Sequence, residues 1–329
     1  MTIKHTNVRS ILFAYLIVLF IFMTGCTAQP VAITPTPLPT NTPLPPTAIP
    51  PTPTTIPRLP LSADEVKALS TEFEGITNEN LQAWDKRDFD QMPQIYAEDI
   101  VFNDVNQELY KGIDGIISLA KSMLSYFPLY ENRLVGTFIG HDDGFYIEDS
   151  WGWAPYDYKS NIFSSDYPLK NFMWLTLRDG KISYWWLFYG EEVFSVQEKP
   201  FDSKIQQDYA GAWSSGDSEA VASLYTPEAL RQDTLFSENQ QGNSAIKAFA
   251  THFFAWHPGV HLTLSETFGE FPKVIKRGGI YTVSVSDPSG QPCDVNMLVL
   301  LEPDESQQKI AQEWLFYNAD SLIACGWAQ

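Results

Sequence analysis

Two aspartates at equivalent points of the chain have the residue type and setting for proton-transfer chemistry. Asp104 and Asp233 lie 129 positions apart, and each closes a short predicted strand, residues 101–104 and 230–233. A carboxylate that faces an apolar pocket has its charged form disfavoured, so its pKa rises and it can move a proton beside a carbonyl. An aspartate at a strand end can instead cap a turn. Arg231 shares the strand face of Asp233, where an ion pair would lower the carboxyl pKa.

Metal and cofactor chemistry find little support in the sequence. His252, His257 and His261 cluster near a helix end, but the chain has no His-Glu-x-x-His motif and no Cys/His zinc spacing. Nucleophile elbows, phosphate loops and dinucleotide fingerprints are also missing, and Asp142-Asp143-Gly144 lacks the remaining ligands of a calcium loop. We therefore expect no metal and no cofactor, and we interpret the histidines as surface or pocket-rim residues.

Aromatic residues are the other candidate binding groups. One segment, which also carries three aspartates, is crowded with aromatic residues. They are Trp151, Trp153, Tyr156, Tyr158, Phe163 and Tyr167. Such rings can bind sugars or apolar rings, although Trp151 and Trp153, two apart, can equally line the inside of a strand. Four further tryptophans are candidate ligand contacts that core packing explains as well: Trp84 and Trp213 on a helix, and Trp186 and Trp314 on the inner face of a last strand.

The chain contains one domain twice. Residues 83–104 recur at 212–233, and the match keeps Trp84, Asp88 and Tyr96 as Trp213, Asp217 and Tyr225. Each copy closes on Lys-Ile followed by Trp-Leu-Phe-Tyr, at 181–189 and 309–317. A period this long indicates tandem domains. We place the first copy at residues 61–197 and the second at 198–329.

Each copy is predicted to run from helices to strands. Ser62 and Glu65 form a capping box for a long first helix that reaches Trp84. Asp88 and Asp217 are expected N-caps of short helices, and a glycine, 112 or 242, precedes a third helix. Alternating runs then predict strands at 133–139, 144–153, 171–177, 181–189, 261–268, 279–286, 294–301 and 309–317, with a hairpin turn at Asp179-Gly180. This order predicts an α+β fold with helices on one face of a curved antiparallel sheet.

The first 60 residues are expected to stay outside the folded domains. Lys4 and Arg9 precede an apolar run at 11–23, which at about 13 residues is shorter than the roughly 20 needed to cross a bilayer. Thr24-Gly25-Cys26 resembles a lipobox, so residues 1–25 are interpreted as a lipoprotein signal peptide, with Cys26 lipidated, for example by palmitate. The protein would then be exported and anchored to the outer face of a bacterial membrane. Residues 26–60, rich in Pro and Thr, predict a disordered stalk.

Charge and cysteine content narrow the choice of partners. The formal net charge of −19 argues against nucleic acid. Cys293 and Cys325 both lie in the second copy, and an exported location permits them to form a disulfide, although two free buried thiols are the alternative.

The order of elements and the motifs together resemble the SnoaL-like branch of the nuclear transport factor two-like superfamily. This resemblance implies two cone-shaped sheets, each wrapped around its long helix. It also implies, by similarity to ketosteroid isomerases, that Asp104 and Asp233 occupy the general-base position and that Tyr209 occupies the position of the tyrosine that binds the enolate oxygen. The first copy has Asn80 in place of that tyrosine. Those enzymes also carry a further acid that assists the tyrosine, in the next-to-last strand. The nearest residues in the second copy are Asp294 and Asn296, and the alignment there is loose.

The leading hypothesis is therefore a surface lipoprotein whose SnoaL-like pockets bind a small, apolar or partly apolar ligand without catalysis. An isomerase, cyclase or dehydratase that uses Asp233 with Tyr209 is the first alternative. A protein-interaction scaffold is the second, in which the two copies pack as an intramolecular pseudo-dimer.

Overall fold

The computed structural model describes residues 61–103, 109–126, 131–140, 150–159, 169–191, 201–233, 238–270 and 276–328. Both copies belong to one compact unit, residues 49–329. The signal peptide, Cys26, the stalk, Asp104 and the Asp142-Asp143-Gly144 turn lie outside the described residues. Within the described ranges, no helix has both the length and the apolar character to cross a membrane.

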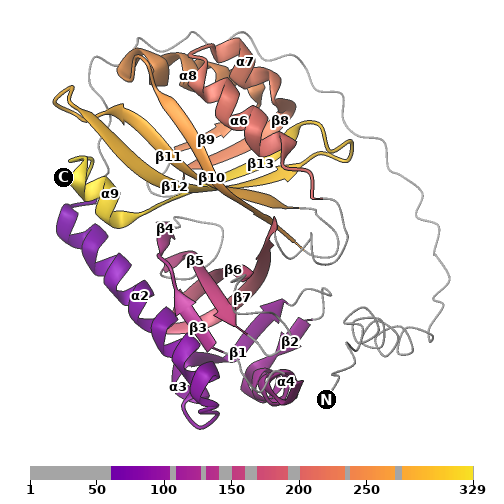
Figure 1. The fold of residues 1–329 in the computed structure, drawn as a ribbon. Helices are drawn as coiled ribbons and strands as arrows, with labels where there is room; N and C mark the ends of the chain where they lie inside the picture. The colour runs from indigo at the N-terminus through magenta and orange to yellow at the C-terminus, as the bar shows by residue number, and fades with distance from the viewer. Residues whose placement is uncertain are drawn as a thin grey trace, which may run out of the picture. The chain divides into compact units, whose positions relative to one another are not determined.

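The first copy starts with helices and continues into strands (Figure 1). Its elements are α2 (Ala63–Lys86), α3 (Met92–Ile95), β1 (Tyr96–Asn103), β2 (Leu109–Lys111), α4 (Gly112–Tyr126), β3 (Glu131–Leu134), β4 (Phe138–Gly140), β5 (Ser150–Lys159), β6 (Leu169–Arg178) and β7 (Lys181–Gly190).

The second copy repeats the scheme, and Figure 1 shows its first three helices on one side of its long strands. Its elements are α6 (Lys204–Ser214), α7 (Ser218–Ser223), β8 (Tyr225–Asp233), β9 (Glu238–Gln241), α8 (Asn243–Trp256), β10 (His261–Gly269), β11 (Arg277–Ser286), β12 (Pro292–Pro303), β13 (Ile310–Tyr317) and α9 (Ala319–Ala324). The sequence pattern did not predict α9.

The helix starts follow local capping chemistry. The capping box of Ser62 and Glu65 is present at the start of α2, and the Asp217 side chain caps α7. The expected cap at Asp88 is wrong, because α3 begins only at Met92. Asp88 instead accepts a hydrogen bond of 3.1 Å from the backbone N–H of Gln91 in the preceding turn. The second residue of α3 is a proline, which is favoured in a first helical turn.

Two strand predictions for the first copy differ from the structure. The predicted strand at 133–139 is divided into β3 and β4, which pair with different halves of β5. Residues 150–153 of the predicted strand at 144–153 belong to β5, which continues to Lys159, and residues 144–149 lie outside the described residues. The hairpin between β6 and β7 is confirmed, since Asp179 and Gly180 have φ angles of 53° and 70°, as a tight turn of the type I′ kind requires.

The strands of the two copies are ordered in the same way. The first copy has the order β4-β5-β6-β7-β1-β2, and the second has β10-β11-β12-β13 with β8 and β9 following β13. In each copy the first strand pairs in parallel with the last, as β1 with β7 and β8 with β13, whereas the neighbouring pairs are antiparallel. The chain thus has a mixed α+β fold with a curved sheet, as expected (Figure 1).

The sheets are covered on both faces. Helices pack on one face of the strands, and a second hydrophobic cluster gathers side chains of both copies on the other. In that cluster the rings of Phe172 and Phe268 stack with 4.0 Å between their centroids. Trp186 and Trp314 pack against this second cluster. The prediction that they lie on the inner face is therefore wrong, because alternate residues of a strand point to opposite faces, and Trp185 and Leu315 occupy the helix-covered side.

Candidate functional site

The second copy contains a cavity between its helices and its sheet. The space between its walls, counted together with the open solvent at its mouth, is about 700 Å³. Its sheet side is apolar, and the strand residues that line it alternate along the chain, as expected for one face of a sheet. Apart from the charged residues of β8, they are Leu262 on β10, Val283 and Val285 on β11, Val295 and Met297 on β12, and Leu315 and Tyr317 on β13.

Aromatic side chains form the opposite walls. Phe249, Phe253 and Trp256 come from α8, and Trp213 comes from α6. Trp327 closes the cavity from the segment that follows α9. A mostly apolar cavity with a few polar groups is the usual form of a small-molecule site.

The polar groups are positioned by the parallel pairing of β8 with β13. In this register Arg231 lies opposite Glu313, and Asp233 lies opposite Leu315. Arg231, Asp233 and Glu313 retain at most 6% of their surface exposed, so three charged side chains share one buried region. Charges in such surroundings need partners to offset the loss of hydration.

Glu313 is held by two tyrosines. Tyr209 donates a hydrogen bond of 2.8 Å to Oε1, and Tyr225 donates a hydrogen bond to Oε2. Burial, followed by the negative charge of Glu313, raises the pKa of both tyrosines well above the usual value, so both hydroxyls remain protonated donors. Burial also raises the pKa of Glu313, although Arg231 and the two hydroxyls act in the opposite direction.

Arg231 links the two acids. Its Nε lies 3.5 Å from Oε1 of Glu313, too far for a hydrogen bond but within ion-pair range, and its Nη2 lies 3.8 Å from Oδ2 of Asp233. Nη1 donates a hydrogen bond of 2.7 Å to Gln240, and the guanidinium lies 4.3 Å from the ring centroid of Phe249. Burial opposes its charge, but Glu313 and Asp233 outweigh this effect and raise the pKa of Arg231.

Asp233 and Tyr209 both line this cavity, so the structure brings the two predicted site residues together. Asp233 is engaged within the protein, since its Oδ2 accepts a hydrogen bond of 2.7 Å from Tyr317 and also faces Arg231. The single hydroxyl proton of Tyr209 is directed to Glu313. The ion pair expected from the spacing of Arg231 and Asp233 is present.

The acid beside Tyr209 was missed in the sequence. The loose candidates Asp294 and Asn296 lie on an exposed face, where they accept hydrogen bonds from Ser284 and Thr282. The acid is Glu313, on the last strand. The signal that identifies it is a charged residue at an inward position of an otherwise apolar strand, where the first copy has Trp185.

The first copy fills the equivalent space with apolar side chains. Phe102 stands in place of Arg231 and Trp185 in place of Glu313, with 4.7 Å between their ring centroids. Tyr96 donates a hydrogen bond to Asn80, the counterpart of Tyr209, and accepts one of 2.8 Å from Trp84. The buried charged cluster therefore occurs only in the second copy, among the described residues of the two.

The other predicted contacts fall in different places. Trp213 lines the cavity, whereas Trp84 is a buried core residue of the first copy. Trp151 and Trp153 belong to β5, and their side chains are outside the described part of the structure. The rings of Trp186 and Trp314 flank the ammonium of Lys276, at 4.8 and 5.7 Å, away from the cavity.

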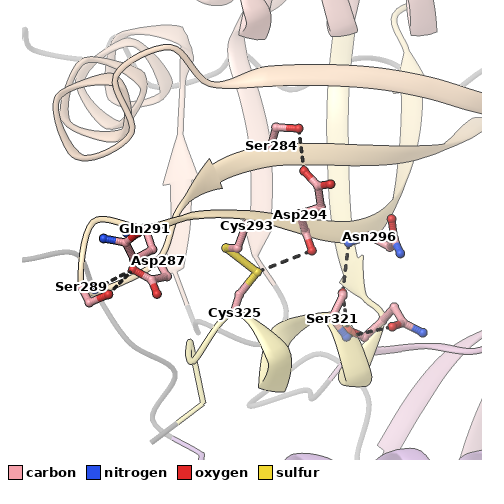
Figure 2. The surroundings of a disulfide bond; sticks show 10 residues. Ser284, Asp287, Ser289, Gln291, Cys293, Asp294, Asn296, Ser321 and Cys325 are labelled. Atoms are coloured by element: carbon pink, nitrogen blue, oxygen red, sulfur yellow. Dashed lines mark hydrogen bonds between the residues drawn. A yellow bond between two sulfur atoms is a disulfide. The ribbon is translucent and has the colours of Figure 1, made fainter.

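A disulfide ties the C-terminal segment to the sheet. Cys293 on β12 is bonded to Cys325, with 5.7 Å between the Cα atoms (Figure 2). Ser321 of α9 accepts a hydrogen bond of 3.0 Å from the backbone of Asn296, as Figure 2 also shows. These bonds hold Trp327, two residues beyond the disulfide, in its place at the cavity.

His257 belongs to the cavity wall. It is 1% exposed, and its ring stacks on Trp327 with 5.2 Å between centroids. Burial lowers the pKa of His257 to about 4, and a hydrogen bond with the backbone of Ser286 offsets only part of this effect. The described residues include no group of three His, Cys, Asp or Glu side chains suited to a metal ion.

Comparison with known proteins identifies the repeated domain. Residues 203–324 match the family model described as SnoaL-like polyketide cyclase, and residues 78–185 match the model of the SnoaL-like domain. The chain carries two tandem SnoaL-like domains. SnoaL-like proteins include polyketide cyclases and ketosteroid isomerases. No curated protein matches the chain.

Two solved structures illustrate the resemblance, both at low identity. A protein with a ketosteroid isomerase-like fold from Catenulispora acidiphila, solved with trimethylamine, is 18% identical, and the match covers 38% of this chain and 92% of that one with a TM-score of 0.34. A protein from Shewanella putrefaciens, provisionally named a SnoaL-like polyketide cyclase, is 10% identical, with coverage of 42% and 93% and a TM-score of 0.34.

Proposed function

We propose that the second SnoaL-like domain binds one small, largely apolar ligand. The observation that carries this proposal is the cavity itself, whose walls are apolar and aromatic and whose polar end is a set of side chains already paired with one another. Such a site gains affinity from burial of apolar surface, at about 25 cal/mol per Å² removed from water. The polar end then orients a carbonyl or hydroxyl group of the ligand, because Arg231 and Tyr317 line the same cavity.

A thermal-shift screen of the intact protein tests this proposal. The panel contains enones, steroid-like compounds and polyketide-like aromatic ketones, since all of them combine an apolar body with one or two oxygen atoms. Binding to the folded state raises the melting temperature, and the shift grows with the logarithm of the ratio of ligand concentration to Kd. At least one class should give a saturable shift. If no compound of the panel stabilises the protein, the small-molecule proposal is wrong.

Catalysis is the second candidate function, because Asp233 and Tyr209 line one cavity. The contacts of both residues favour binding over proton transfer, since Asp233 faces Arg231 and the Tyr209 proton is directed to Glu313. Incubation of the panel ketones in heavy water distinguishes the two functions. Binding alone predicts no enzyme-dependent exchange of the protons beside the carbonyl. Exchange that is lost in Asp233→Asn would favour the isomerase or cyclase alternative.

A scaffold role remains the third candidate, and contacts between the copies favour a pseudo-dimer. Strand β10 pairs with β7 through Phe268 and Gly269, and β13 pairs with β4 at Tyr317 and Ile139. These strand pairs join the two domains of a single chain, as an intramolecular pseudo-dimer requires. A partner protein that binds the intact chain in pull-down experiments, together with a negative ligand screen, would favour this role.

We also propose that the two domains are carried outside the cell by a lipid anchor at Cys26. The support is the sequence of the first 60 residues, with basic residues, an apolar run, a lipobox-like Thr-Gly-Cys and a Pro/Thr-rich stretch. Expression of the full chain in a bacterium with labelled palmitate tests this proposal. The label should enter the wild-type protein and be absent from Cys26→Ser. Labelling of both proteins, or of neither, would contradict the lipid anchor.

A further inference from the structure

An aromatic row connects the charged end of the cavity to its other end. The guanidinium of Arg231 lies over Phe249, and Phe249 stacks on Phe253 with 5.9 Å between centroids. Phe253 in turn contacts His257, at 4.7 Å between centroids, and His257 stacks on Trp327. Phe249 and Phe253 are four residues apart and therefore lie on one face of α8, and His257, four positions further on, is the residue that caps the end of this helix. At a rise of 1.5 Å per residue, Phe249 and His257 are about 12 Å apart along the helix.

The far end of this row holds a polar atom without a partner. Nδ1 of His257 is buried, and no hydrogen-bond partner for it exists among the described residues. Leaving a buried polar atom unpaired costs about 1 to 3 kcal/mol. The ring lines the cavity, so a bound molecule can satisfy this atom. The low pKa of His257 keeps the ring neutral near pH 7, and a neutral imidazole has one acceptor nitrogen.

We propose that His257, under the ring of Trp327, is the specificity-determining residue of this cavity. Its Nδ1 accepts a hydrogen bond from a hydroxyl or N–H group at one end of an elongated ligand, whose apolar body lies along Phe249 and Phe253. The ligand is therefore about 10 to 12 Å long and carries a donor group at the His257 end, a length set by the helix spacing. This inference rests on the proposed binding function and adds the ligand class and the residue that selects it.

Three matched probes test the inference. Each is a biphenyl methyl ketone, and the para position of the second ring carries a hydroxyl, a methoxy or a methyl group. The hydroxyl probe can donate a hydrogen bond, the methoxy probe can only accept one, and the methyl probe can do neither. Affinities are measured by isothermal titration of the full chain. Wild type should bind the hydroxyl probe about three- to tenfold more tightly than the other two, the range expected for one net hydrogen bond.

Substitutions at position 257 identify the residue responsible. His257→Phe keeps an aromatic ring for stacking, so it should bind all three probes with equal affinity. His257→Asn restores a polar atom and should regain part of the preference. The control is His252→Phe on α8, because His252 contacts Trp256 but does not line the cavity. This variant should keep the full preference.

The outcomes separate the inference from the function on which it rests. If the probes bind wild type without preferring the hydroxyl, or if the preference persists in His257→Phe, the role of His257 is overturned while the binding function stands. If none of the probes binds wild type and the wider screen is also negative, both are overturned.

Discussion

The hydroxyl of Tyr209 donates a hydrogen bond of 2.8 Å to Glu313, a carboxylate with no exposed surface. Tyr209 was expected to present its proton to a ligand oxygen, and this bond commits the proton to a protein acid instead. The same acid accepts from Tyr225 and faces Arg231. The pair therefore indicates that the polar end of the cavity is a preformed network of hydrogen bonds and ion pairs.

Removal of the charge of Glu313 should destabilise the protein. In Glu313→Gln, Asp233 at 3.8 Å is the one charged partner that Arg231 keeps among the described residues. Removing one member of a buried ion pair typically costs about 3 kcal/mol or more. Urea unfolding measures the change. Glu219→Gln, which breaks the exposed pair with Lys247, is the matched control and should change stability little. Equal stability of Glu313→Gln and wild type would contradict the network described above.

The residues of the first copy provide a replacement for the whole ion pair. Arg231→Phe/Glu313→Trp introduces the counterparts Phe102 and Trp185 into the second copy. Replacing a buried ion pair with apolar side chains is often neutral or stabilising, so the double variant should be more stable than either single variant. Thermal and urea unfolding of the three proteins test this order. A double variant less stable than both singles would show that the two copies pack too differently for the exchange.

Acid should weaken the protein through His257. The unfolded residue titrates near its usual pKa of 6.5, whereas burial lowers the folded pKa to about 4. The unfolded state therefore binds the proton more tightly, and stability should fall as pH decreases from about 6.5 toward 4. The loss is about 3 kcal/mol, at 1.36 kcal/mol per pKa unit.

The pH dependence of stability has to be compared between wild type and His257→Phe. Glu313 is present in both proteins and changes their stability with pH in the direction opposite to His257. The raised pKa of Glu313 means that the folded state gains a proton more readily, so this group favours the fold as pH decreases. The difference between wild type and variant isolates the histidine. The free energy of unfolding of wild type minus that of the variant should decrease as pH falls, and a difference that is constant from pH 7 to about 4 would contradict the pKa shift of His257.

The disulfide should stabilise both the fold and the cavity wall. It closes a segment of 32 residues, for which loop-closure entropy predicts a loss of about 3 to 4 kcal/mol when the bond is removed. Cys293→Ala/Cys325→Ala should unfold at lower urea, and hydrogen exchange at residues 319–328 should become faster. Reduction of the wild type should reproduce both effects. Unchanged exchange in this segment would show that hydrogen bonds such as Asn296 to Ser321 alone hold Trp327 in place.

Local chemistry made much of the fold predictable from sequence. The capping box at Ser62, the cap at Asp217 and the turn at Asp179-Gly180 depend on neighbouring residues only, and all three are present. The break between β3 and β4 was not predictable, because it depends on pairing with β5. Trp186 and Trp314 were assigned to the wrong face. Both faces of these strands are covered, so apolar residues occur at odd and at even positions along them, and alternation does not distinguish the faces.

The candidate site was predictable only in part. The repeat and the resemblance to ketosteroid isomerases indicated Asp233, the resemblance indicated Tyr209, and the spacing along the strand indicated the opposing Arg231. The structure places all three at one cavity. Glu313 and the unpaired Nδ1 of His257 depend on contacts between residues far apart in the chain, 104 positions in the case of Tyr209 and Glu313. Sequence periodicity does not contain such contacts.

Titration calorimetry of the intact protein with the most stabilising compound of the ligand panel tests ligand binding in the second domain most directly. Wild type should bind one molecule per chain, because the buried charged cluster and its cavity belong to the second domain. Arg231→Phe/Glu313→Trp should remain folded and show no binding, since its polar end is replaced by the packing of the first domain. Absence of binding to wild type, or unchanged one-to-one binding to the folded double variant, would contradict a ligand site in this cavity.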